Sequence, residues 1–230
     1  MGTVLITGAN RGIGLEMVRI YAGQGDRVIA CCRDPEGADA LNQLAEEGDV
    51  RVQKVSVGEA ESVAAMAKDL EGTAIDVLVN NAGMGGPAYE NQTVSNMDFE
   101  GWAETFNINT MAPVRVMQAL DSNLKLAENP KVVSVTSQMG ALDLDMTVAY
   151  AYCTSKAALN KFMRMAAVEL AGQGIAVCVI HPGWVRTEMG GPGAAISPEE
   201  SAQGMINVIA GLNADNTGSF WTWDGETHAW

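Results

Sequence analysis

Short apolar runs alternate with longer segments along the whole 230-residue chain, and this alternation restricts the fold more than any other feature. Each run is rich in β-branched residues and apolar at successive positions, so both of its faces must be buried. Such strands, joined by helices, are typical of a parallel sheet with right-handed crossovers. The runs are "TVLIT" (3–7), "RVIACC" (27–32), "VRVQKV" (50–55), "IDVLVNN" (75–81), "KVVSVTS" (131–137), "IAVCVIH" (175–181) and "SFWTW" (219–223).

The alternation predicts an α/β fold, a doubly wound Rossmann-type and mostly parallel seven-stranded sheet with helices on both faces. The last helix should begin with Ser197 as N-cap, Pro198 at the first helical position and Glu200 at N3. No linker or repeat divides residues 1–230, so we expect a single domain. The expected helices lie at about 12–23, 36–46, 60–70, 98–125, 150–172 and 198–211.

The formal net charge of −14 disfavours two classes of partner. Phosphate backbones and anionic lipid headgroups would both be repelled, so we expect neither nucleic acid nor a membrane surface as a partner. The first residues do not resemble a secretory signal, and no apolar run reaches transmembrane length. The four cysteines show no C-x-x-C spacing, which argues against a zinc site and fits a reducing cytoplasm.

The turn "TGANRGIG" follows the first predicted strand directly and opens the first helix. Gly8, Gly12 and Gly14 would let backbone N–H groups and the helix N-terminus approach a pyrophosphate. The spacing G-x-x-x-G-x-G differs from the general dinucleotide fingerprint, so a glycine-rich turn without a ligand is the alternative. The position after a first strand favours a dinucleotide site.

The end of the second predicted strand decides between NADP and NAD. An acid at this place binds the ribose 2′-hydroxyl of NAD, whereas a base accepts the 2′-phosphate of NADP. Arg33 stands there, and Arg11 in the glycine turn could supply a second cation, although Asp34 follows directly. The sequence therefore favours NADP over NAD, with a solvated loop charge at Arg33 as the alternative.

The stretch "YAYCTSK" holds two tyrosines near one lysine. Tyr152 and Lys156 are four residues apart, so on a helix they lie nearly one above the other, about 6 Å apart along the axis. Tyr150, six residues before Lys156, would point to a different side of the helix. We expect it to pack in the protein or to line the site without a chemical role. An ammonium beside a phenol lowers the phenol pKa, which would make Tyr152 a usable acid and base.

Five motifs in order extend this interpretation to the whole chain: "TGANRGIG", "NNAG" (80–83), "SQMG" (137–140), "YCTSK" (152–156) and "HPGWVRT" (181–187). Together they resemble the short-chain dehydrogenase/reductase family. Details such as "GANRGIGLEMVR" and "CRDP" are most similar to its branch of carbonyl reductases, Sniffer and C-factor-like proteins.

The resemblance implies a catalytic set. Tyr152 would donate the proton in carbonyl reduction, Lys156 would bind the nicotinamide ribose and lower the tyrosine pKa, and Ser137 would hydrogen-bond the substrate oxygen. Asn109 would hold a water at a helix kink, and Pro113 supports this because its missing N–H frees the carbonyl of Asn109. Alignment with the family assigns no such role to Asn107. For Ser137 the alternative is a strand-end cap.

The resemblance also implies the cofactor contacts. The adenosine half of the cofactor would be bordered by Asn81, Ala82 and Gly83. Val57 would be an apolar contact of the adenine, although Ser56 stands where the family often has an aspartate. Pro182 and Gly183 would turn the chain past the nicotinamide, with Val185 and Thr187 near its carboxamide. The full predicted set is Gly8, Asn10, Arg11, Gly12, Ile13, Gly14, Arg33, Val57, Asn81, Ala82, Gly83, Tyr152, Lys156, Pro182, Gly183, Val185 and Thr187.

The activity expected from this set is hydride transfer between NAD(P) and a carbonyl or alcohol, with a hydrophobic aldehyde or ketone as substrate. The lid at about 188–197 is short and glycine-rich, and Met139 and Trp184 are the predicted pocket residues. A hydrolase is disfavoured, because the chain lacks a G-x-S-x-G elbow and has two histidines. The remaining alternative is a nucleotide-binding signalling protein on the same fold. Family members often form dimers or tetramers, so we expect a homodimer or homotetramer.

Overall fold

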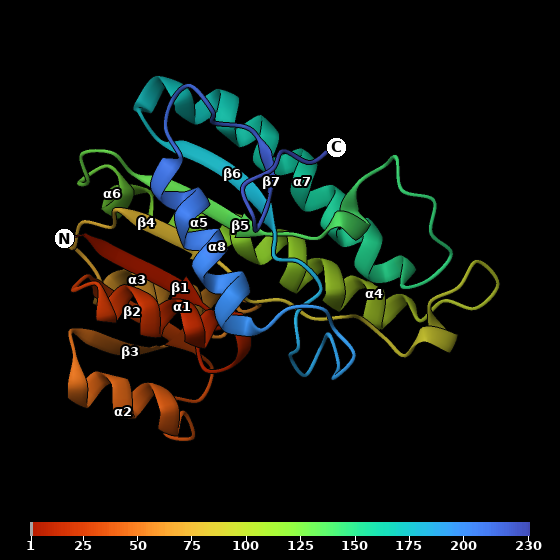
Figure 1. Cartoon of the computed structure of the whole chain (residues 1–230), viewed down its shortest axis with the longest axis horizontal. Coiled ribbons are helices and arrows are strands. Elements are labelled where there is room, and N and C mark those ends of the chain that lie inside the picture. Colours follow the sequence, from red (N-terminus) through yellow and green to blue (C-terminus); the bar gives the residue numbers. More distant parts are fainter. Residues whose placement is uncertain (1) are drawn as a thin grey trace.

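The computed structural model describes residues 2–230 (Figure 1). Its centre is a seven-stranded parallel sheet in the order β3-β2-β1-β4-β5-β6-β7. The reversal of strand order between β1 and β4 opens a crevice at the carboxyl ends of the strands, where such folds bind ligands. The predicted doubly wound fold is confirmed, with strands β1 (Thr3–Thr7), β2 (Arg27–Cys32), β3 (Val50–Lys54), β4 (Val77–Asn80), β5 (Lys131–Val135), β6 (Ala176–His181) and β7 (Phe220–Thr222).

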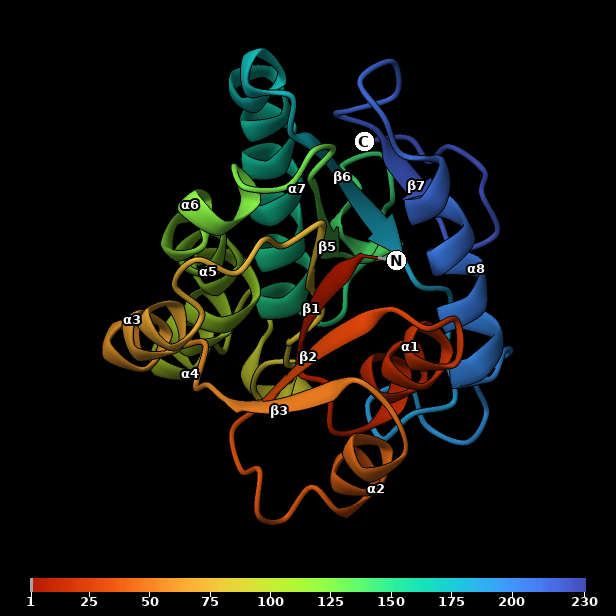
Figure 2. The same ribbon diagram turned by 90° about the vertical axis from the view of Figure 1, so that its left-hand side faces the viewer.

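Two hydrophobic cores lie on opposite faces of this sheet. Successive strand residues serve different faces: Leu5 belongs to one core, and Val4 and Ile6 belong to the other. Figure 2 shows the two helical layers on either side of the strands. One layer contains α3 (Ala60–Asp69), α5 (Ala112–Ala119) and α7 (Tyr150–Leu170), and the other contains α1 (Gly12–Gly23), α2 (Asp39–Glu47) and α8 (Pro198–Gly211).

The helix expected at 98–125 is interrupted. It consists of α4 (Phe99–Phe106), a π-helical turn (Asn107–Met111), α5, and α6 (Asp121–Leu124). By contrast, α8 begins as predicted, because the Ser197 hydroxyl accepts a 3.1 Å hydrogen bond from the backbone N–H of Glu200. None of the helices within residues 2–230 is both long and apolar enough to cross a bilayer.

The C-terminal segment folds back along the edge strand β7. The backbone N–H of His228 donates to the Phe220 carbonyl at 2.7 Å, and the Trp230 ring lies 5.5 Å from that of Phe220. The guanidinium of Arg164, on α7, stacks 4.9 Å from the Trp230 ring. The tail therefore covers the edge of the sheet beside β7.

Candidate active site

An open cleft of about 1360 Å³ lies at the carboxyl ends of the parallel strands. Segments that follow β1 to β6 all contribute to it, so it spans the switch point of the sheet. It exceeds the roughly 300 to 1000 Å³ of a typical small-ligand pocket and suits an extended ligand. Predicted site residues in its lining are Gly8, Asn10, Arg11, Gly12, Ile13, Arg33, Val57, Asn81, Ala82, Gly83, Tyr152, Lys156, Pro182 and Thr187.

The glycine turn is packed so closely that a side chain would not fit at Gly8 or at Gly14. Gly8 has φ +65°, and a Cβ atom there would lie 2.9 Å from the Ala82 Cα atom. A Cβ atom at Gly14 would lie 2.6 Å from Nδ2 of Asn81. Gly14 is outside the cleft lining, so its part is to let α1 approach the strands, which directs the helix N-terminus at the cleft.

Asn81 holds the glycine turn to the end of β4. Its Nδ2 atom donates to the carbonyls of Thr7 and Gly8, both at 3.0 Å. The Thr7 hydroxyl accepts from the backbone N–H groups of Asn81 and Ala82 at 3.0 and 3.1 Å. Sequence reasoning missed Thr7, which looks like an ordinary β-branched strand residue until β1 and β4 are placed side by side.

Lys156 and Tyr152 lie together on α7, as their spacing predicts. Lys156 is 4% exposed, and its Nζ atom donates a 2.8 Å hydrogen bond to the Val135 carbonyl at the end of β5. The same atom lies 5.8 Å from the centre of the Tyr152 ring. Burial of the ammonium lowers the pKa of Lys156 to about 8.

The expected lowering of the Tyr152 pKa is not found. Burial raises the pKa of Tyr152 to about 12, and a hydrogen bond with the Ser137 side chain opposes the rise only partly. The prediction treated Lys156 as a fully charged neighbour and neglected how strongly burial of the phenol itself disfavours the phenolate. The neutral phenol retains its proton, which is the form that a proton donor requires.

Ser137 has the capping role that was its alternative, and its role toward a substrate oxygen stays a prediction. It follows β5, and its hydroxyl accepts a 3.2 Å hydrogen bond from the backbone N–H of Met139, which caps a short 3₁₀ turn. The same side chain is close enough to Tyr152 to lower the pKa of its phenol. The cap therefore fixes the hydroxyl in a position where it can also contact a group bound beside the tyrosine.

Asn109 is buried in the π-helical turn and connects three segments. Its Nδ2 atom donates to the Met84 carbonyl at 2.8 Å and to the Ser155 hydroxyl at 3.0 Å, and its Oδ1 atom accepts from the Met84 N–H at 2.9 Å. The helix irregularity expected at Pro113 is therefore present, as a π turn in which the Ala112 N–H donates to the Asn107 carbonyl. The water-holding role of Asn109 stays a prediction.

Gly83 lies next to the side chains of both Asn109 and Lys156. A Cβ atom at Gly83 would be 3.3 Å from Oδ1 of Asn109 and 3.6 Å from Nζ of Lys156. A side chain at this position would fill the space in front of the lysine. The cleft thus retains room for a ligand group beside Lys156, which fits the predicted nicotinamide ribose.

Two residues that contact the lid, Arg11 and Trp184, differ from expectation. Arg11 pairs with Glu188, so its guanidinium is not free for a phosphate as predicted. Trp184 is 60% exposed and lies outside the cleft lining, with its indole N–H donating to the Gly190 carbonyl at 2.9 Å. Both differences arise because the segment after Thr187 turns back across the glycine turn, a contact between residues 177 positions apart.

Several other predicted residues support the cleft from outside its lining: Gly14, Asn109, Ser137, Met139, Gly183 and Val185. Val185 is buried and pairs with Ile196 at the base of the lid. Asn107, which the alignment leaves without a role, does line the cleft. Within residues 2–230, His, Cys, Asp and Glu side chains form no group of three that could hold a metal ion.

Comparisons with known proteins agree with this geometry. The family model described as short chain dehydrogenase matches residues 2–195. The C-signal protein of Myxococcus xanthus is 40% identical over 157 residues, which cover 68% of this chain and 93% of that protein.

Two solved structures are similar over the whole chain. The NADPH-bound carbonyl reductase from chicken fatty liver superposes with a TM-score of 0.92 at 32% identity, covering 100% of this chain and 99% of that one. The carbonyl reductase Sniffer of D. melanogaster has a TM-score of 0.94 at 28% identity, with 100% of both chains covered. The branch predicted from the sequence motifs is confirmed.

Proposed function

Because the chain belongs to the short-chain dehydrogenase family, we propose that it is an NADP(H)-dependent oxidoreductase that interconverts a carbonyl compound and its alcohol. The observation that carries the proposal is the placement of Tyr152 beside Ser137 and within 5.8 Å of the Nζ atom of the buried Lys156, at the edge of a dinucleotide-sized cleft. A bound nicotinamide would supply or accept the hydride.

The chain's own residues would move the proton and hold the reacting oxygen. Tyr152 stays protonated through neutral pH because burial raises its pKa, so it would donate its proton to the carbonyl oxygen as negative charge develops there. Ser137 would donate a second hydrogen bond to that oxygen. Lys156, fixed by the Val135 carbonyl, would hold a ribose hydroxyl in the space that Gly83 leaves open.

Arg33 supports NADP as the cofactor. It lines the cleft directly after β2, where the adenosine ribose is expected, and it makes no ion pair among residues 2–230. A free guanidinium at this position suits a 2′-phosphate. The NADPH in the chicken carbonyl reductase agrees with this assignment.

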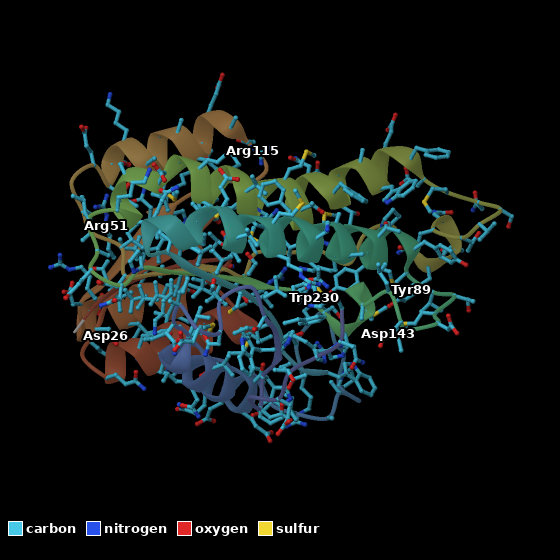
Figure 3. All side chains as sticks on the ribbon, turned by 90° about the horizontal axis from the view of Figure 1, so that it is seen from above. Asp26, Arg51, Tyr89, Arg115, Asp143 and Trp230 are labelled. Carbon is cyan, nitrogen blue, oxygen red and sulfur yellow. The ribbon has the colours of Figure 1, made fainter. Side chains whose placement is uncertain are left out.

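Exposed apolar side chains near the start of α7 support a hydrophobic substrate. Leu142, Met146 and Val148 are exposed in the loop between Ser137 and α7. Tyr89 is close enough to raise the pKa of Tyr152 and lies at the same end of the molecule as Asp143 (Figure 3). Segments 84–98, 138–150 and 188–197 contain five carboxylates and no Lys or Arg, so an uncharged aldehyde or ketone fits better than an anionic one.

The test measures NADPH consumption, through the loss of its absorbance, with a panel of uncharged aldehydes, ketones and quinones. We expect turnover with apolar carbonyl compounds and little with carboxylate-bearing ones. Binding of NADPH without turnover of any compound would favour the alternative of a signalling protein, a function suggested by the name of the Myxococcus C-signal protein. The paired Tyr152 and Lys156 favour the enzyme.

The assembly and the compartment are also proposals. The outer face of α7 exposes Met165 and Val168, which is consistent with a homodimer or homotetramer. Light scattering after size exclusion would give the oligomeric state. All four cysteines are free, and three of them are buried, which is consistent with a reducing cytoplasm.

A further inference from the structure

Arg115 connects helix α5 to the far end of the cleft. Its Nη1 atom donates a 2.8 Å hydrogen bond to the Val57 carbonyl, and its Nη2 atom donates a 3.1 Å hydrogen bond to Oδ1 of Asn107. Figure 3 shows Arg115 on the helical layer, well away from Asp143 at the substrate end. The two ends of one guanidinium thus hold a loop after β3 and the first residue of the π-helical turn.

Asn107 continues this connection. Its Nδ2 atom donates to the Gly58 carbonyl at 3.2 Å and to the Glu104 carboxylate at 3.3 Å. Gly58 is pressed against the π-helical turn, because a Cβ atom there would lie 2.7 Å from Cδ1 of Ile108. The carbonyls of Val57 and Gly58 are therefore held by side chains from α5 and the π turn, outside any strand ladder.

The held loop forms one wall of the cleft. Val57, Gly58 and Glu59 line it together with Cys32 and Arg33, which follow β2. In a doubly wound sheet the end of the second strand meets the adenosine ribose, so this wall faces the adenine. The opposite, nicotinamide end is held by Asn109, which belongs to the same five-residue π turn as Asn107.

We propose that Arg115 is a positioning residue for the adenine end of the cofactor, acting through Asn107 and the Val57–Gly58 backbone. The proposal depends on the cofactor class of the proposed function. A guanidinium can serve two acceptors in fixed directions at once, whereas an ammonium is a single point charge. A lysine at this position should therefore hold one of the two partners but not both.

The experiment separates the two halves of the cofactor. Calorimetric titration with adenosine 2′,5′-bisphosphate measures the adenine end, and an NMR titration with reduced nicotinamide mononucleotide measures the other. Arg115→Met should weaken the bisphosphate by about tenfold, the scale of one charge-assisted hydrogen bond lost at a binding wall. Affinity for the mononucleotide should be unchanged, and Arg115→Lys should fall between Arg115→Met and the wild type.

Arg51→Met is the matched control, because Arg51 is exposed on β3 and its loss makes the same change in net charge. It should leave both affinities as they are. Asn107→Ala should lower the affinity for the bisphosphate as much as Arg115→Met does. If Arg115→Met does not fold, Asn107→Ala and Arg115→Lys test the proposal in its place.

The proposal would be overturned if the Arg115 and Asn107 variants bound both fragments equally more weakly, or if they bound both as tightly as the wild type does. A wild-type protein that binds neither fragment would instead contradict the proposed function itself.

Discussion

The Nζ atom of Lys156 lies 5.8 Å from the centre of the Tyr152 ring, on the same face of helix α7. The ammonium also donates to the Val135 carbonyl, so it is attached to the sheet and not to solvent. Burial acts on each group in the opposite direction: it lowers the pKa of Lys156 to about 8 and raises the pKa of Tyr152 to about 12.

The lowered pKa of Lys156 predicts a pH-dependent stability. Between pH about 8 and 10.5 the unfolded chain binds the lysine proton more fully than the folded chain does. The free energy of unfolding should therefore rise with pH in this window, by up to about 1.4 kcal/mol per unit. Below the window, the buried charge costs stability.

Urea denaturation across this window, for the wild type and Lys156→Met, measures the effect. Tyr152 acts in the opposite direction, because its raised folded pKa adds stability that is lost as the pH rises through about 12. It is present in both proteins, so the difference between them isolates the lysine. Parallel stability curves would contradict the assignment.

Arg33 should discriminate between the two dinucleotides. Arg33→Ala removes the cation beside the expected 2′-phosphate, so the Kd for NADPH should rise by about tenfold or more, while the Kd for NADH should change little. Arg27→Ala is the control, because Arg27 is exposed and pairs with Asp49 at the start of β2. An equal loss for both dinucleotides would show that Arg33 does not contact the 2′-phosphate.

The pair between Arg11 and Glu188 predicts an effect of salt on cofactor binding. Both side chains are exposed, so their pairing contributes little to folding. Glu188→Gln frees the guanidinium and removes a negative charge from the cleft, so NADPH should bind several times more tightly at low ionic strength. The gain should shrink as salt is added. A salt-independent gain would point to a change of shape.

Asn109 should contribute more to stability than any exposed asparagine. Asn109→Ala leaves the partly buried N–H and carbonyl of Met84 without their side-chain partners and the buried Ser155 hydroxyl without its donor, at a cost of about 2 to 4 kcal/mol in the free energy of unfolding. Asn207→Ala, at an exposed position of α8, should change it by about 0.5 kcal/mol or less. Denaturation midpoints compare the two, and equal losses would contradict the bridging role.

The strand pattern and the motif positions could be predicted from the sequence because both depend only on which residue types follow one another over a short stretch of chain. Continuous runs of β-branched apolar residues identified β1 to β7, and the i, i+4 spacing placed Tyr152 near Lys156. The Ser197 cap followed from three residue types within four positions.

The remaining features depend on contacts between distant segments. Asn109 meets Met84 and Ser155 only after folding, from within the π turn that divides the expected long helix. The raised pKa of Tyr152 follows from burial, which residue spacing does not report. Arg115 reaches Val57 across 58 positions, and nothing in its local sequence marks it.

The most direct test of the account is Tyr152→Phe. The variant keeps the ring on α7 and loses only the hydroxyl that contacts Ser137. We expect NADPH binding to be retained and kcat for carbonyl reduction to fall by about 100-fold to 10,000-fold, the contribution of a positioned proton donor. A variant that binds NADPH and reduces the same carbonyl compounds at the wild-type rate would contradict the central claim.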